Sequence, residues 1–241
     1  MPGLQRARLD DGIEVLRLDR PEVRNALGSA QLSELEAALS GLAGDDALRA
    51  VVVSTTDVRA LCSGADVGER LDHAGGVARM EAFARVYAAF GALAVPTVAV
   101  CVGNVVGAGV EIAAGCDLRI GGDNLKLVWA GARMGAPVGP ARLVPLVGLS
   151  RAKELVLTGR VVGMDEALAI GFLHRGAAAG DAEAAAIALA REVAAHDPDG
   201  VRSLLALFRE LERLDARVAH ENERLVDWQR HGPGLRPRGG A

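Results

Sequence analysis

Hydrophobic residues recur along this chain with two different spacings. Residues 13–18 alternate apolar and charged side chains, which is typical of a short strand. Residues 29–42 carry leucines at spacings of three and four, and this pattern predicts a helix with one apolar face. The runs at residues 50–53 and 97–102 are almost entirely apolar, as expected for parallel strands that are buried on both faces.

The same alternation of strand and helix continues through the middle of the chain. Apolar residues gather on one side of residues 77–93, and a further helix opens over residues 110–115. Residues 117–120 have the pattern of another short strand. Regular alternation of strands and helices favours an α/β fold with parallel pairing.

The pattern changes after about residue 181. Residues 182–195 and 200–229 have helical spacing, with no strand between them. We therefore predict two regions, an α/β core over residues 1–180 and a helical region over residues 181–241.

Composition narrows the class of protein. The formal net charge is −4, whereas a nucleic-acid-binding protein normally carries a basic surplus, so we predict no nucleic-acid partner. No apolar run reaches the length of a transmembrane helix, and residues 1–10 lack the apolar centre of a signal peptide. We therefore predict no membrane partner and a cytoplasmic location.

The three cysteines lack the spacing of a metal site. Cys62, Cys101 and Cys116 form no CxxC pair and no cluster with histidine, and each lies in an apolar or glycine- and alanine-rich stretch. We interpret them as buried thiols, with neither a disulfide framework nor a metal site.

Two glycine-rich turns carry the candidate chemistry. One spans residues 62–66, and the other spans residues 103–109 between a predicted strand and a predicted helix. A strand that turns through glycines into a helix leaves free N–H groups at the helix N-terminus, which suit an anion or an oxygen that becomes anionic during reaction. Glu111 lies in the first turn of that helix, where its carboxylate could transfer a proton at the same oxygen.

Simpler interpretations exist for these residues. Gly107-Ala108-Gly109 resembles part of a dinucleotide-binding fingerprint, but the third glycine is missing and Glu111 stands where a pyrophosphate would need to approach. Glu111 alone could simply complement the helix dipole, and Asp66 could be a structural cap.

Several stretches of the chain decide between these interpretations, because they occur together in one order between about residues 13 and 175. They read LDRPEVRNAL (18–27), LRAVVV (48–53), LCSGAD (61–66), PTVAV (96–100), GAGVEIA (107–113), CDLRI (116–120), LVGLSRAKEL (146–155) and LTG (157–159). In these motifs and their spacing the chain resembles the enoyl-CoA hydratase/isomerase (crotonase) superfamily. The resemblance implies a crotonase-like spiral of ββα units in the core, a C-terminal helical region that makes trimer contacts, and a homotrimer or hexamer.

The resemblance also implies a site. The backbone N–H groups of Ala65 and Ala108 would form an oxyanion hole for the carbonyl oxygen of an acyl-CoA thioester, with Glu111 as the catalytic acid/base. Gly131 would line the pocket, and Trp129 could line it too, although a lone tryptophan is usually a packing residue. CoA would arrive as part of the substrate, with no metal and no other cofactor. The residues implied to contact substrate or CoA are Arg24, Ala26, Arg59, Gly64, Asp66 and Gly107.

One position departs from the family pattern. Hydratases of the family carry a second glutamate twenty residues after the first, whereas this chain has Gly131 there. Loss of one acid–base partner typically costs 10²–10⁴ in rate. Double-bond isomerisation, decarboxylation of a malonyl-type thioester and slow hydration therefore stay open, as does a non-catalytic acyl-CoA-binding or regulatory protein.

Overall fold

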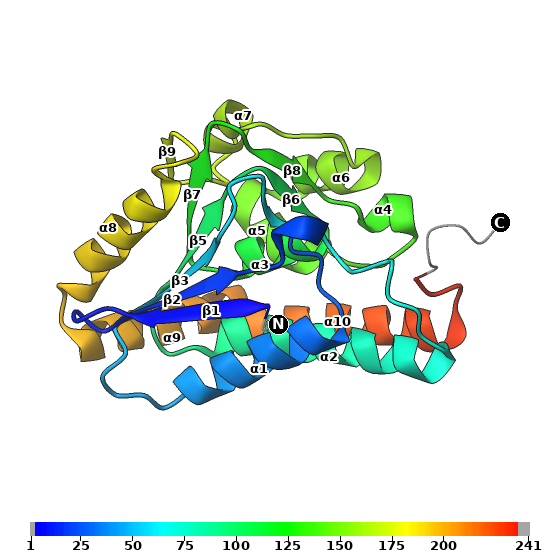
Figure 1. The fold of residues 1–241 in the computed structure, drawn as a ribbon, viewed down its shortest axis with the longest axis horizontal. Coiled ribbons are helices and arrows are strands. Elements are labelled where there is room, and N and C mark those ends of the chain that lie inside the picture. Colours follow the sequence, from blue (N-terminus) through cyan, green and yellow to red (C-terminus); the bar gives the residue numbers. More distant parts are fainter. Residues whose placement is uncertain (1–2, 236–241) are drawn as a thin grey trace.

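The computed structural model describes residues 3–235 and contains two β-sheets with helices around them (Figure 1). The larger sheet has the order β1-β2-β3-β5-β7-β9; β1 is antiparallel to β2, and the remaining pairs are parallel. Its strands are β1 (Leu4–Arg8), β2 (Ile13–Leu18), β3 (Ala50–Thr55), β5 (Thr97–Cys101), β7 (Leu118–Gly122) and β9 (Arg175–Ala177). The smaller sheet is parallel and consists of β4 (Ala60–Cys62), β6 (Asn104–Val106) and β8 (Lys126–Val128).

The two sheets grow together as a spiral. Each turn adds one strand to the larger sheet, the next strand to the smaller sheet, and then a helix. The three turns are β3-β4-α2, β5-β6-α3 and β7-β8-α4, with α2 at His73–Ala92, α3 at Ala108–Gly115 and α4 at Gly131–Met134. This arrangement confirms the predicted α/β fold with a spiral of ββα units.

The remaining helices surround this spiral. They are α1 (Ser29–Leu42), α5 (Pro140–Val147), α6 (Leu149–Thr158), α7 (Met164–Ala169), α8 (Ala182–Ala194), α9 (Pro198–Glu212) and α10 (Leu214–His231), with a 3-10 turn at Pro21–Val23. In Figure 1, α1, α2 and α10 run side by side along one face of the larger sheet, and α8 lies across from them. None of the helices within residues 3–235 combines the length and the apolar character needed to cross a bilayer.

Both faces of the larger sheet are buried, and this explains the unbroken apolar runs in its strands. Val51 and Val53 of β3 belong to the hydrophobic cluster that includes α1 and α2, whereas Ala50 and Val52 belong to a second cluster that includes α8. Successive side chains of a strand point to opposite faces, so a strand covered on both sides needs an apolar residue at every position.

The second cluster also includes the first helix of the predicted helical region. Ala182, Ala186 and Leu189 of α8 are buried in one cluster with strand residues of the sheet, so α8 packs directly on the core. The division of the chain at residues 180 and 181 stays a prediction. The ends of the two predicted regions, residues 1–2 and 236–241, lie outside the described residues.

The last predicted helix, residues 200–229, is corrected. It is two helices, α9 and α10, which meet at Arg213 in a left-handed conformation with φ 51°. The α9 helix has no buried residue, and Leu204, Leu207, Phe208 and Leu211 are each at least half exposed along one of its faces. By contrast, α10 packs against α2 and buries Val218 and Leu225.

Candidate active site

Three loops meet at one edge of the smaller sheet, because each loop follows a strand of that parallel sheet. Cys62 of β4 pairs with Val105 of β6, and Val106 pairs with Val128 of β8. The segments that follow these strands, residues 63–65, 107–108 and 130–131, therefore lie next to one another.

Glycines bring the first two of these loops into direct contact. Gly107 has φ +50° and Gly64 has φ +108°, conformations that other residues rarely adopt. A Cβ placed on Gly64 would lie 3.3 Å from the carbonyl oxygen of Val106 and 4.0 Å from the amide nitrogen of Ala108. The loop that carries Gly64 and Ala65 thus passes directly beside the first residue of α3.

The amide groups of Ala65 and Ala108 are both free to bind an oxygen atom. Neither N–H donates a hydrogen bond to another residue of the described range 3–235. Ala108 begins α3, and the first N–H groups of a helix have no partner within the helix and carry partial positive charge. Both residues line the same cavity.

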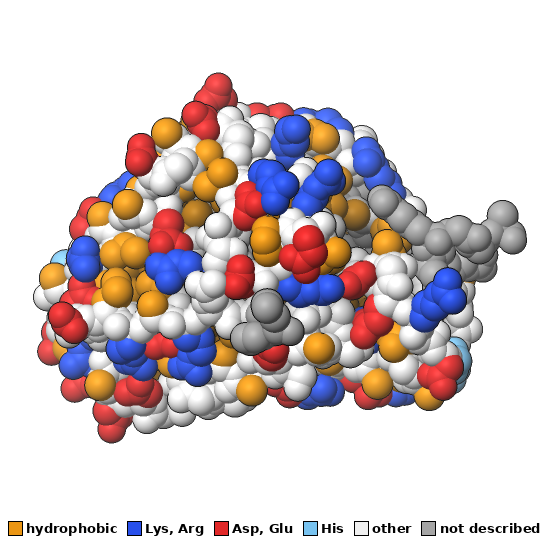
Figure 2. All heavy atoms as spheres, viewed as in Figure 1, with side chains coloured by type: hydrophobic (Ala, Val, Ile, Leu, Met, Phe, Trp, Pro, Cys, Tyr) orange, Lys and Arg blue, Asp and Glu red, His pale blue; other side chains and the backbone are white. Residues whose placement is uncertain are grey.

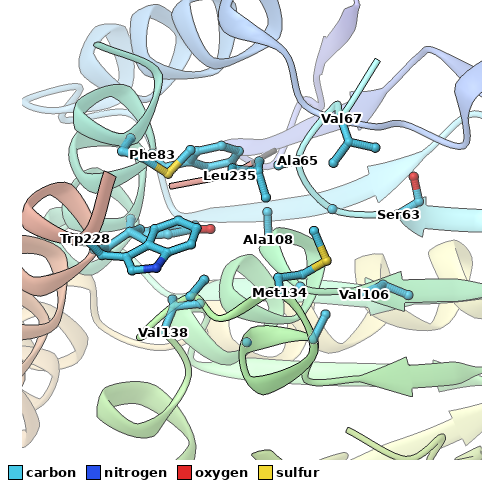
Figure 3. Close-up of a pocket in the computed structure, with 18 residues that line it drawn as sticks. Ser63, Ala65, Val67, Phe83, Val106, Ala108, Met134, Val138, Trp228 and Leu235 are labelled. Carbon is cyan, nitrogen blue, oxygen red and sulfur yellow. The ribbon is translucent and has the colours of Figure 1, made fainter. Parts of the chain in front are cut away.

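That cavity measures about 310 Å³ and is mainly apolar. Figure 3 shows Ala65 and Ala108 close together at the cavity, with Phe83, Met134, Val138 and Trp228 around it. Its walls come from the three loops, from α2, from α10 and from the segment after α4. The lining residues are Ser63, Gly64, Ala65, Val67, Met80, Phe83, Tyr87, Val106, Gly107, Ala108, Ala130, Gly131, Met134, Ala136, Val138, Leu225, Trp228 and Leu235.

Tyr87 brings a hydroxyl group to this apolar cavity. The hydroxyl makes no hydrogen bond to any described residue, whereas the other hydroxyl in the lining, Ser63 Oγ, donates to the carbonyl of Val23 at 3.2 Å. Burial raises the pKa of Tyr87 well above its ordinary value, and the charge of Glu111 raises it further, so the phenol stays protonated at neutral pH.

Glu111 belongs to a buried ionic cluster. Its Oε2 accepts a hydrogen bond from Arg142 Nη1 at 3.1 Å, and the same nitrogen donates to Glu221 Oε1 at 3.0 Å. The side chains of Glu111, Arg142 and Glu221 are 3%, 2% and 8% exposed. The guanidinium carbon of Arg142 also lies 4.5 Å above the centre of the Tyr87 ring.

Burial raises the pKa of Glu111 to about 7. The positive charge of Arg142 opposes this effect of burial, and the negative charge of Glu221 adds to it. Glu111 therefore exchanges its proton near neutral pH, which is the property required of a group that both gives and takes a proton.

The carboxylate of Glu111 is not part of the cavity lining in this conformation. Its Oε1 accepts no hydrogen bond from the described residues, and a Cβ placed on Gly139 would lie 3.4 Å from it. Val138, next to Gly139 in the chain, lines the cavity. The segment 136–139 therefore lies beside both the cavity and Glu111.

The two residues predicted to line the pocket differ in outcome. Gly131 lines the cavity, and a Cβ there would lie 2.7 Å from the carbonyl oxygen of Val138, so this backbone leaves no room for a side chain. Trp129 is not part of the lining: it is buried and packs edge-on against Phe172 with ring centroids 5.4 Å apart. The tryptophan in the cavity wall is Trp228 of α10.

The turn that contains Arg24 and Ala26 lies against the first glycine-rich loop. The amide of Ser63 donates to the carbonyl of Arg24 at 3.0 Å, and the amide of Leu27 donates to the carbonyl of Gly64 at 2.9 Å. Arg24 is exposed, and Ala26 is buried. The structure thus joins two of the segments that the sequence assigned to CoA.

Arg59 and Asp66 lie outside the cavity lining. Arg59 is exposed and forms an ion pair of 2.5 Å with Asp57. Asp66 Oδ2 accepts from Arg20 at 3.2 Å, and its Oδ1 accepts from the amide of Gly68 at 3.0 Å. These bonds give Asp66 a structural role in the loop.

The sequence interpretation missed Arg142 and Glu221. Glu111, Arg142 and Glu221 come from α3, α5 and α10, and no local pattern links three positions so far apart. One signal was available: Glu221 and Asn222 interrupt the apolar stripe formed by Val218 and Leu225, and a charged residue in such a stripe requires a buried partner.

Comparison with known proteins places this site in context. A family model described as enoyl-CoA hydratase/isomerase matches residues 8–229. Enoyl-CoA hydratase domain-containing protein 2, mitochondrial, from Homo sapiens is 33% identical over 206 residues, which cover 80% of this chain and 69% of that protein. Probable enoyl-CoA hydratase 2, mitochondrial, from Arabidopsis thaliana is 32% identical over 200 residues, which cover 80% of this chain and 66% of that protein. The chain thus spans about two thirds of the length of these two relatives.

Solved structures show the same fold. DspI from Pseudomonas aeruginosa superposes with a TM-score of 0.82 at 26% identity, over 94% of this chain and 95% of that one. An enoyl-CoA hydratase from Mycobacterium smegmatis superposes with a TM-score of 0.79 at 26% identity, over 92% and 90% of the two chains.

Proposed function

Because this chain belongs to the enoyl-CoA hydratase/isomerase family, we propose that it binds an acyl-CoA thioester whose carbonyl oxygen accepts hydrogen bonds from the amides of Ala65 and Ala108. One observation carries this proposal: two amides from different loops have no partner among the described residues and line one apolar cavity. Two such donors stabilise the negative charge that develops on the oxygen when the α-carbon becomes an enolate.

We propose that Glu111 transfers the proton in this reaction. A carboxyl group whose pKa is about 7 serves as base and as acid at neutral pH. In double-bond isomerisation, Glu111 takes a proton from the α-carbon of a 3-enoyl thioester, the electrons pass to the carbonyl oxygen, and the proton returns to the γ-carbon. This reaction needs one carboxyl group and no positioned water.

Isomerisation is favoured over efficient hydration because the chain has no carboxylate at position 131. Hydration also needs a water molecule held at the β-carbon, and the backbone around Gly131 leaves no space for a side chain that would hold it. We expect hydration to be slower than in a two-carboxylate enzyme by a factor on the order of 10²–10⁴.

In the same proposal, Arg24, Ala26, Gly64 and Gly107 contact the CoA part of the substrate, which passes over the joined loops. The exposed guanidinium of Arg59 is available to the CoA phosphates. CoA enters as part of the substrate, and this chemistry requires no metal and no redox cofactor.

A second candidate is a protein that binds acyl-CoA without turnover. The observation in its favour is that Glu111 is bonded to Arg142 and lies outside the cavity lining. In that case the amides of Ala65 and Ala108 would still hold the thioester, and no proton would be transferred.

Purified protein tested with 3-enoyl-CoA, crotonyl-CoA and malonyl-CoA separates these functions. Isomerisation that falls at least about 100-fold in Glu111→Gln supports the enzyme. Binding in calorimetry with no turnover of any thioester supports the second candidate. Loss of carbon dioxide from malonyl-CoA that survives Glu111→Gln would replace isomerisation by decarboxylation.

We also propose that the chain assembles as a homotrimer or a hexamer. The apolar face of α9 supports this assembly, because Leu204, Leu207, Phe208 and Leu211 are 50–72% exposed on a single helix. Contiguous apolar residues of this kind normally mark a surface that another molecule covers.

A further inference from the structure

The cluster around Glu111 holds two carboxylates and one guanidinium group. Arg142 Nη1 lies 3.1 Å from Glu111 Oε2 and 3.0 Å from Glu221 Oε1. Three helices supply these side chains, and all three are at least nine-tenths buried. With both carboxylates ionised, the cluster would carry a net charge of −1 away from water.

One proton removes this excess charge. Buried charges are costly unless they are paired, and a single guanidinium pairs fully with one carboxylate. When two acids compete for one cation in such a place, one of them keeps its proton to a much higher pH than an isolated carboxyl group.

Hydrogen bonds decide which carboxylate keeps the proton. Glu221 accepts two bonds, from Arg142 Nη1 at 3.0 Å and from the amide of Ala141 at 2.7 Å. Glu111 accepts one bond, from Arg142, and its Oε1 has no partner among the described residues. Because donated hydrogen bonds stabilise an ionised carboxylate, the smaller number of donors to Glu111 favours Glu111 as the carboxyl group that keeps the proton.

The surroundings hold Arg142 between these two acids. Its guanidinium stacks on the Tyr87 ring of α2 at 4.5 Å, and its Nη2 donates to Asn222 Oδ1 at 3.4 Å. Asn222 in turn donates to the carbonyl of Ala84 at 3.1 Å, which ties α10 to α2. Arg142 therefore keeps one position relative to both carboxylates.

The other titratable groups nearby stay neutral. Tyr87 on α2 lies against Arg142, and burial raises its pKa well above its ordinary value. Cys62 on β4 lies near Tyr87, and burial raises the pKa of its thiol to about 12. Glu221 on α10 and Arg142 on α5 are thus the charged side chains around Glu111 in the described part of the chain.

We propose that Glu221 and Arg142 are positioning residues that keep the exchangeable proton of the site on Glu111. The C-terminal helix α10 thereby supplies a second carboxylate that acts through Arg142 and not on the substrate. This inference rests on the proposed function, in which Glu111 transfers that proton. Its consequence is that Glu111 should lose its proton near neutral pH only while Glu221 is charged.

Glu221→Gln tests the proposal, because the glutamine side chain has nearly the same shape as glutamate and carries no negative charge. The amide oxygen of glutamine can still accept from Ala141, while Arg142 is left with one carboxylate partner. We expect the pKa of Glu111 to fall by at least about one pH unit, toward that of an ordinary ion-paired carboxyl group. The control is Glu223→Gln, the same substitution at an exposed position of the same helix.

The measurement is a titration of the Glu111 carboxyl carbon by ¹³C NMR, with Glu111→Gln used to assign the signal. In the enzyme, the acidic limb of the pH profile of kcat should move down with that titration, and KM should stay within about twofold. An unchanged Glu111 titration in Glu221→Gln overturns the proposal, whatever the activity.

A second variant covers the case in which Glu221→Gln does not fold. Arg142→Lys keeps the positive charge, so Glu111 should titrate near its wild-type pH, whereas Arg142→Met should raise that pH. If Glu111 titrates at the same pH in Arg142→Lys and Arg142→Met, the proposal is also overturned. If the titrations move as expected but no thioester is turned over, the proposed enzymatic function fails and the placement of the proton stands.

Discussion

Gly109→Ala tests the close approach of two loops on which the proposed oxyanion hole depends. Gly109 is the second residue of α3, and a Cβ built on it would lie 2.4 Å from the carbonyl oxygen of Cys62 and 2.9 Å from the Cys62 Cβ. Cys62 ends β4, directly before the loop that carries Ala65. The atoms in the way are backbone atoms, which cannot rotate aside, so β4 and α3 must separate.

The size of the effect follows from two opposing contributions. Overpacking a buried site costs about 1–3 kcal/mol, and we expect the upper end here because the overlap is with backbone. Alanine gains about 1 kcal/mol over glycine in a helix. The net loss of about 2 kcal/mol should lower the Tm by about 4–8 °C in a chain of this size.

Gly41→Ala is the matched control. Gly41 also lies within a helix, α1, but no atom lies within 4 Å of a Cβ placed there. The same substitution should therefore raise the stability by about 0.5–1 kcal/mol.

Thermal unfolding and thioester turnover of the two variants are then compared. Because one misplaced oxyanion donor costs roughly 10²–10³ in rate, Gly109→Ala should lose at least about tenfold in kcat, while Gly41→Ala should keep wild-type activity. If Gly109→Ala is as stable and as active as Gly41→Ala, the two loops do not approach as described and the oxyanion hole is not formed by them.

Four further predictions address the site and the surface. Since burial raises the pKa of Glu111 to about 7, the folded state keeps a proton that the unfolded chain releases near pH 4.5; the resulting stability is present below about pH 4.5 and is lost as the pH rises through 7. The Tm should thus fall between pH 5 and pH 8. Calorimetry should show a smaller decrease of Tm over this range in Glu111→Gln, and an equal decrease in the two proteins would contradict this. Tyr87→Phe removes a hydroxyl that makes no hydrogen bond to the described residues, so the Tm should stay within about 2 °C of wild type. The rate of hydration should fall more than the rate of isomerisation, because the hydroxyl can hold a water molecule in the cavity. An equal fall in both rates would contradict that role. Trp228→Ala enlarges the cavity and should shift kcat/KM toward longer acyl chains by at least about tenfold in a series of thioesters; an unchanged preference would show that the acyl chain lies elsewhere. Leu207→Asp places a charge on the apolar face of α9 and should reduce the mass found by light scattering to that of one chain, whereas a wild-type protein that is already monomeric would refute the proposed assembly.

The elements that the sequence predicted best are those whose burial repeats regularly. The leucine spacing of residues 29–42 matches α1, because the helix buries Leu32, Leu35, Leu39 and Leu42 on one face. The unbroken apolar run that begins at residue 50 matches β3, because both faces of the sheet are covered. In both cases local spacing and tertiary burial agree.

The sequence failed where the deciding contact is distant or where the backbone takes an unusual conformation. Arg213 ends α9 with a positive φ although it is not glycine, so nothing in the apolar spacing of residues 200–229 marked the break. From the sequence we named Trp129 as a lining residue and did not consider Trp228. The packing of α10 against α2 brings Trp228 to the cavity, whereas Trp129 packs against Phe172 and is not in the lining.

The candidate site was also predicted only in part from the sequence. The glycine pattern located the loops of Ala65 and Ala108, because positive φ angles and close approach restrict which residues can stand there. Arg142 and Glu221 were not predicted from the sequence. Their ion pairs with each other and with Glu111 link different helices, so they depend on a fold that brings residues 111, 142 and 221 together.

The lack of a carboxylate at position 131 and the ionic cluster have a common physical origin in the segment after α4. The carbonyl oxygens of Ala136 and Val138 lie 2.9 and 2.7 Å from where a Cβ of residue 131 would be, so this segment fills the space that a longer side chain would need. Continuing through Gly139, the same segment leads into α5, which places Arg142 beside Glu111. A glutamate introduced at position 131 would therefore have to displace the segment that fixes Arg142, and would disturb the proton on Glu111 while adding a second acid. For this reason Gly131→Glu should lose activity and not gain hydration, and a faster hydration rate in that variant would show that the segment can move without releasing Arg142.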